Sequence, residues 1–150
     1  MEKWTRTFLK RLQQELSPYC EEGYYLEAEG ENPEMLRQIF VTGRELSLSV
    51  LMDMAVFVME DESCLLQVYT LIETEDNPDE GLLERINALN IAIPLGAFGY
   101  FTEQKELYHK YSLRIKEPED IEEFVYDMFD LVQIILNIVG NCYGELTQEL

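Results

Sequence analysis

The stretch from residue 82 to residue 115 constrains the fold more than any other part of the chain. It begins with Leu82, Ile86 and Leu89 at the spacing of a helix face. An apolar link from Ile91 to Gly96 follows, and two segments of alternating side chains then flank an acidic turn. Alternation with a period of two is typical of strands. The stretch therefore predicts a short helix followed by a β-hairpin.

The rest of the chain shows the same two periodicities. Two segments predict helices, at residues 2–16 and 117–143. Three segments predict strands, at residues 39–41, 46–59 and 65–72, and residues 24–29 also fit a short strand. The order is helix, three strands, helix, two strands, helix. It predicts a single α+β domain over residues 1–150, with an antiparallel sheet packed by helices.

Two acidic segments mark helix starts. Asn77 can cap the helix that follows it, Pro78 suits the first helical position, and Glu80 lies three residues after the cap. The segment Glu117 to Asp120 places carboxylates at the positive end of the last helix.

The last helix is apolar over more of its circumference than one sheet face requires. Both flanks of its apolar seam are themselves apolar, with Phe124, Leu131 and Ile138 on one side and Phe129 and Leu136 on the other. A helix that covers a sheet needs about three apolar positions in seven, and this helix has a further one in each heptad. We expect the surplus to form a dimer or partner surface. A core that lies wholly within one chain is the alternative.

The charge of the chain argues against several classes of partner. The formal net charge is −19, so the chain repels the phosphates of nucleic acids and of anionic membranes. No apolar run reaches the ~20 residues that a membrane span needs. The acidity has two explanations: it serves solubility alone, or it suits a basic or aggregation-prone partner.

Composition and cysteine usage indicate a folded chain in a reducing compartment. Hydrophobic residues make up 47% of the chain, which is enough to build a core despite the charge. Cys20, Cys64 and Cys142 are widely spaced and form no Cys-x-x-Cys pair. Free thiols in the cytoplasm are the simplest interpretation.

His109 is the only histidine, which excludes a site with two histidines from one chain. It lies on the apolar side of its strand, between Leu107 and Tyr111. This position favours a buried, hydrogen-bonded histidine over a catalytic one. We expect the chain to have no catalytic residue and not to be an enzyme.

Two segments resemble ligand loops but fail on inspection. The acidic segment 76–81 does not fit a calcium loop, because Pro78 has no ligating side chain and the twelfth position is Asn87. Gly96 and Gly99 lack the Lys-Ser/Thr pair of a phosphate loop. We therefore expect no metal and no cofactor.

Asn87 and Asn90 are the polar residues of the predicted helix that most need an explanation. Their amides can satisfy backbone groups at the helix end and at the entrance of the hairpin. A ligand site is the alternative. We interpret them, together with Pro94 and Gly96, as a structural motif.

Four segments together resemble the YbjN-like family. They are Asn87-Ala88-Leu89-Asn90, Pro94-Leu95-Gly96-Ala97-Phe98, the strand 108–113 and Tyr143-Gly144-Glu145-Leu146. The likeness covers about residues 46–147. That family is similar in fold to type III secretion chaperones, so the resemblance implies a small, acidic α+β protein that is often dimeric.

Two classes of function are left open. The first is a non-enzymatic protein-binding module, chaperone-like or regulatory, that forms a homodimer or binds a protein partner. The second is a small-ligand-binding or enzymatic domain whose site is assembled from dispersed residues. Exposed apolar surface would favour the first class, and a deep pocket with convergent polar groups would favour the second. We expect the first class, with neither nucleic acid nor membrane as a partner.

Overall fold

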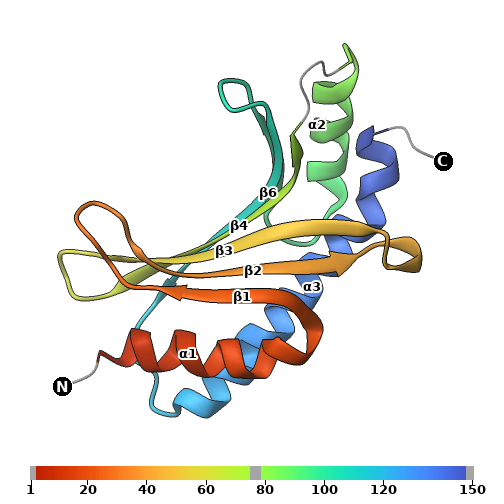
Figure 1. Ribbon diagram of the computed structural model, residues 1–150. Helices are drawn as coiled ribbons and strands as arrows, with labels where there is room; N and C mark the ends of the chain where they lie inside the picture. The colour runs from red at the N-terminus through yellow and green to blue at the C-terminus, as the bar shows by residue number, and fades with distance from the viewer. Residues whose placement is uncertain (1–2, 75–78, 148–150) are drawn as a thin grey trace.

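The computed structural model describes residues 3–74 and 79–147, and this part of the chain is an α+β domain (Figure 1). Its helices are α1 (Trp4–Leu16), α2 (Leu82–Ala92) and α3 (Ile121–Thr147). Its strands are β1 (Cys20–Leu26), β2 (Glu34–Thr42), β3 (Leu48–Val58), β4 (Cys64–Thr74), β5 (Ala97–Phe101) and β6 (Glu106–Ile115). Two short 3-10 turns, η1 (Ser17–Tyr19) and η2 (Arg44–Leu46), complete the described elements.

The six strands form one antiparallel sheet in the order β1-β2-β3-β4-β6-β5. Hairpins join β1 to β2, β2 to β3 and β3 to β4, so these strands are neighbours both in sequence and in space. The chain then passes through α2 and returns as the β5–β6 hairpin. Within that hairpin β6 pairs with β4, which leaves β5 at the edge.

The sheet has one more strand before α2 than the predicted order of three. The fourth is β1, which pairs with β2 from Cys20 to Leu26 and so begins earlier than the predicted segment 24–29. Its first residues include Glu21, Glu22 and Gly23, which are poor strand formers. As an edge strand it needs only one neighbour, so pairing with β2 outweighs its weak intrinsic preference.

All three described helices lie on the same side of the sheet (Figure 1). Alternate strand residues on that side, such as Leu36, Met52, Met54 and Leu66, have no exposed surface. They pack against the apolar faces of the helices in one hydrophobic core. This arrangement follows because the strands place apolar residues on one face with a period of two, and the helices place theirs on one face with helical spacing.

The other side of the sheet is covered by no helix of the described residues (Figure 1). Its central cross-strand row joins Ile39 of β2, Leu51 of β3, Leu71 of β4 and Tyr108 of β6. Each of these side chains is half-buried. We call this side the open sheet face; its middle is apolar, although exposed faces of antiparallel sheets are commonly polar.

The start of α2 differs in detail from the sequence expectation. The helix begins at Leu82, with Gly81 before it and no side-chain cap. Asp79 instead accepts a hydrogen bond from the Gly81 N–H, at 2.9 Å. The predicted cap Asn77 and the following Pro78 lie outside the described residues.

Aromatic packing fills much of the space beside α3. The Phe124 ring lies 4.7 Å from that of Phe8 and 6.4 Å from that of Trp4, both on α1. On the other flank, Phe129 meets Tyr19 of η1 edge-on at 5.5 Å. The chain therefore covers part of the apolar surplus that the sequence shows on this helix.

Candidate functional site

The outward side of α2 is the most exposed apolar helix face in the described residues. Leu83 is 62% exposed and Ile91 is 89% exposed. They lie eight residues apart with Asn87, also exposed, midway between them at successive helical turns. Exposed Ala88 and Ala92 lie beside this line. We call these five residues the α2 stripe.

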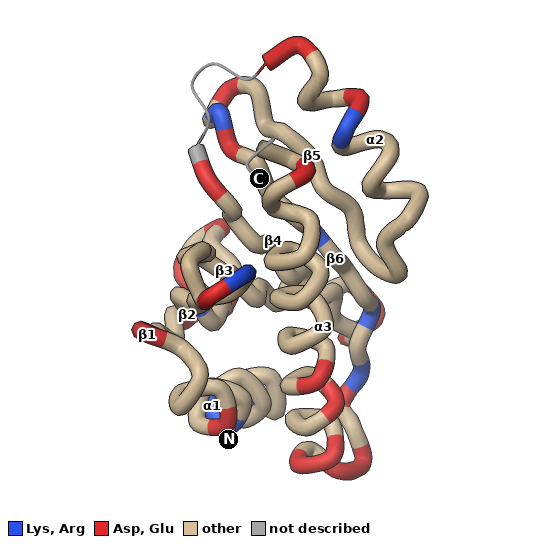
Figure 2. Tube along the Cα trace, turned by 90° about the vertical axis from the view of Figure 1, so that its right-hand side faces the viewer, with Lys and Arg blue, Asp and Glu red and all other residues tan. Residues whose placement is uncertain are grey.

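The charged residues of α2 lie near its start, and the rest of the helix is uncharged (Figure 2). The opposite side of α2 is buried through Leu82, Ile86 and Leu89. A helix that is apolar on both sides is normally buried all round. The α2 stripe is therefore a surface that lacks a cover within the described chain.

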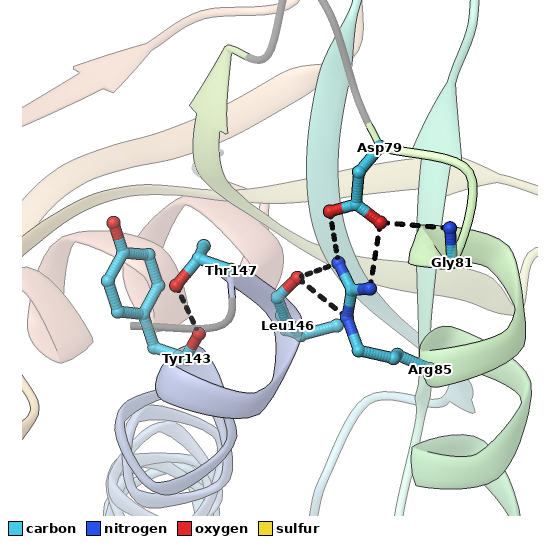
Figure 3. A network of polar contacts seen from close by, with 6 residues as sticks. All are labelled: Asp79, Gly81, Arg85, Tyr143, Leu146 and Thr147. Carbon is cyan, nitrogen blue, oxygen red and sulfur yellow. Dashed lines mark hydrogen bonds and ion pairs between the residues drawn. The ribbon is translucent and has the colours of Figure 1, made fainter. Parts of the chain in front are cut away.

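An arginine network holds α2 against the end of α3 (Figure 3). Arg85 donates two hydrogen bonds to the Asp79 carboxylate, at 2.9 and 2.8 Å. The same guanidinium donates to the carbonyl oxygen of Leu146, at 2.9 Å. Arg85 holds the pKa of the Asp79 carboxyl below its ordinary value, because its hydrogen bonds favour the charged form. The network fixes the position of α2 and also satisfies a carbonyl at the C-terminal end of α3.

Asn90 fixes the other end of α2 to the sheet. Its amide nitrogen donates to the Phe98 carbonyl at 2.9 Å, and its amide oxygen accepts from the Phe98 N–H at 2.7 Å. Phe98 lies on the edge strand β5, so the side chain takes the place of a neighbouring strand there. Asn87, in contrast, is exposed on the α2 stripe.

The link between α2 and β5 is closely packed at one glycine. Gly96 has a φ of +72°, and a Cβ placed on it would come within 2.3 Å of His109 Cε1. Both facts restrict the position to glycine. Pro94 in the same link is exposed.

The α3 residues that the sequence predicts as a partner surface differ in how far the structure buries them. Leu136 and Ile138 are buried within the chain, at 7% and 8% exposure. Phe124, Phe129 and Leu131 are half-buried against the core. The chain itself covers most of this predicted surface. The sequence pattern did not show that the apolar residues of α3 would be covered and those of the α2 stripe left exposed.

A groove of about 1190 Å³ runs between α2, the second half of α3 and the turn between β2 and β3. Arg44, Arg85, Asn141, Tyr143 and Glu145 supply its polar lining, and small or apolar residues supply the remainder. It gathers polar groups from dispersed parts of the sequence. The Arg85 guanidinium is already bound to Asp79 and Leu146, so it is not free to act on a ligand.

The described residues contain no group of three or more side chains suited to hold a metal ion. The cysteines are unpaired, and burial raises the pKa of all three thiols. A raised pKa reduces the thiolate fraction, so these thiols are not activated nucleophiles.

No helix of the described residues has the length and apolar character that crossing a membrane requires. Comparison with known proteins finds no family model, no curated protein and no solved structure that matches the chain. The likeness to the YbjN-like family stays a prediction from its motifs.

Proposed function

We propose that the chain is a non-enzymatic protein-binding module, chaperone-like or regulatory, that assembles as a homodimer. The observation that supports this most strongly is the amount of surface left uncovered. The chain exposes 9251 Å². A folded monomer of its mass, 17.6 kDa, exposes about 7,900 Å² on the general scaling of surface with mass. The excess, about 1,350 Å², is larger than the roughly 800 Å² that each partner buries in a stable interface of standard size.

The α2 stripe is the surface that best suits self-association. In a twofold dimer the same surface meets itself, so Leu83 of one copy would pack against Ile91 of the other. Ala88 and Ala92 leave room for the two helices to approach closely. Asn87 would then lie on the twofold axis. Its amide has both donors and an acceptor, so two copies can bond each other and fix the register.

The open sheet face would remain free in such a dimer and is the surface we assign to a different protein. Its apolar row gives a partner area to bury. Arg37 and Asp53 stand beside this row and are bound to each other, with N–O distances of 2.8 and 3.0 Å. Because this ion pair is already satisfied, an apolar partner segment could cover the row without separating the charges.

Small-ligand binding is the second candidate function, and the groove between α2 and α3 favours it. Its volume of about 1190 Å³ lies somewhat above the range of ligand pockets, about 300–1,000 Å³. We also propose the cytoplasm as the location, because the unpaired thiols of all three cysteines suit a reducing compartment.

Analytical ultracentrifugation of matched variants tests the assembly. At micromolar concentration the wild-type chain should sediment at twice its mass of 17.6 kDa, and Ile91→Asp should sediment as a monomer. A buried unpaired carboxylate in the interface would cost more than the contact gains. Ile134→Asp is the control, because Ile134 is an exposed isoleucine of α3 at 45% and lies outside the α2 stripe.

The same measurement distinguishes the two helices. If Leu131→Asp splits the dimer and Ile91→Asp does not, the interface lies on α3 and the α2 assignment fails. A wild-type chain that is monomeric at every concentration would remove the homodimer from the proposal.

A further inference from the structure

Three buried side-chain atoms of the described residues have no hydrogen-bond partner: Gln38 Oε1, Thr70 Oγ1 and His109 Nδ1. The three residues belong to one row across the buried side of the sheet. Gln38 of β2 is opposite Met52 of β3, Met52 is opposite Thr70 of β4, and Thr70 is opposite His109 of β6. Unsatisfied buried polar groups are rare in folded proteins, and three in one row call for a physical explanation.

The geometry of His109 defines its protonation state. The ring has no exposed surface, and its Nε2 lies 3.1 Å from the carbonyl oxygen of Leu95. A carbonyl oxygen only accepts hydrogen bonds, so Nε2 carries the proton. The neutral ring then has a lone pair on Nδ1 that has no hydrogen-bond partner. A second proton would create a cation in a buried position, which desolvation disfavours.

Among the described residues, no charged group contributes to the pKa of the ring, which responds to burial and to the Leu95 hydrogen bond. Thr70 is its neighbour on β4, and the Phe98 ring of β5 meets it edge-on at 5.2 Å. Gly96 of the link lies over its Cε1. On β6 itself, Leu107 and Tyr111 share its face of the sheet. The Tyr111 phenol is the only ionisable group among these residues.

Burial lowers the pKa of His109, and the hydrogen bond to Leu95 opposes this shift to a smaller extent. A histidine whose pKa is lower in the folded than in the unfolded state binds fewer protons when folded. The free energy of unfolding therefore does not depend on this histidine well above the ordinary histidine pKa of about 6.5. It decreases as the pH falls below that value.

The contacts of the His109 ring determine which part of the fold responds to its protonation. His109 holds Leu95, which lies in the link between α2 and β5. The strand β5 is at the sheet edge and pairs only with β6. We propose that His109 is an acid-sensitive latch: a proton on Nδ1 forces the link away from β6, and α2 and β5 open while β1 to β4 stay folded. Opening would expose the buried face of α2, formed by Leu82, Ile86 and Leu89.

Hydrogen exchange read by mass spectrometry at pH 7.5 and pH 5.5 tests the latch, with times scaled for the intrinsic pH dependence of exchange. Peptides within residues 82–101 should lose several-fold in protection at the lower pH, because the buried ring binds a proton less readily than the ring of the opened chain. Peptides of β3 should keep their protection. Peptides of β5 lie outside the α2 stripe, so their exchange tests the latch separately from the proposed dimer.

His109→Gln is the matched variant. The glutamine amide can donate to Leu95 as Nε2 does but does not titrate, so the variant should show equal protection at both values of pH. Equal acid-induced opening in this variant would assign the effect to carboxylates and overturn the proposal. His109→Phe serves as a second non-titrating variant if the glutamine does not fold.

The wild-type chain offers an independent measurement. His109 is the only histidine, so its Hε1 resonance reports the titration without overlap from another imidazole. The midpoint should lie below 6.5 and coincide with the loss of protection in residues 82–101. A midpoint at or above 6.5, or protection that survives protonation of the ring, would contradict the latch.

Discussion

Asn90 does at the edge of β5 what a neighbouring strand would otherwise do. Its side-chain amide bonds both backbone groups of Phe98, so its removal leaves two polar groups without partners. Asn90→Ala should lower the free energy of unfolding by about 1–3 kcal/mol, the penalty for unsatisfied buried groups. Urea unfolding measures the change. Asn137→Ala, at an exposed position of α3, is the control and should change stability by less than about 0.5 kcal/mol. Equal effects in both variants would contradict the role of Asn90.

The residue scale shows what a sequence can and cannot reveal. Local chemistry predicted that an asparagine near a helix end would bond the backbone, and proline and glycine predicted a tight link. The sequence could not reveal which strand the amide reaches, because the partner is set by the return of the chain through β5. The burial of His109 was predictable from the alternation of its strand. That Gln38, Thr70 and His109 form one row of buried polar groups without partners can be seen only from the register of the sheet.

Close approach of two backbones determines how α3 meets the turn between β2 and β3. A Cβ on Gly140 would lie 2.7 Å from the Gly43 nitrogen and 2.9 Å from its Cα. Backbone atoms cannot move aside as a side chain can, so Gly140→Ala should destabilise the chain by about 1–3 kcal/mol. Thermal unfolding measures this change. The control is Gly23→Ala, whose Cβ would meet Gln38 Cγ at 3.4 Å, an ordinary contact. Unchanged stability of Gly140→Ala would show that the two elements can separate freely.

The long elements were predictable, whereas the bounds of the edge strand β1 and the cover of α3 were not. Long runs of period two or of helical spacing define β3, β6 and α3 almost regardless of context, and a run that is apolar on both faces defines β4. β1 depends on pairing with β2 more than on its own residues. The apolar flanks of α3 are covered partly by Trp4, Phe8 and Tyr19, and a pattern within α3 cannot show how far this cover extends.

At the scale of the whole molecule, the three helices share one face of the sheet and leave two apolar surfaces uncovered. One is the open sheet face, and the other is the α2 stripe. The net charge of −19 keeps separate copies apart over most of the surface, especially at low ionic strength. The five residues of the α2 stripe are uncharged, and exposed Glu84 lies beside them one turn before Ala88, so two copies can meet on the stripe if this carboxylate stays in contact with water.

A disulfide across the proposed twofold axis tests this assembly most directly. Helices packed with axes about 8–10 Å apart bring facing Cα atoms within the roughly 4.4–6.8 Å that a disulfide spans. Asn87→Cys should therefore form a covalent dimer on mild oxidation, of twice the 17.6 kDa mass on a non-reducing gel. Ser112→Cys, exposed on the open sheet face, and the wild-type chain should remain monomeric on the same gel. An Asn87→Cys chain that cross-links no more than these controls would contradict a homodimer built on α2.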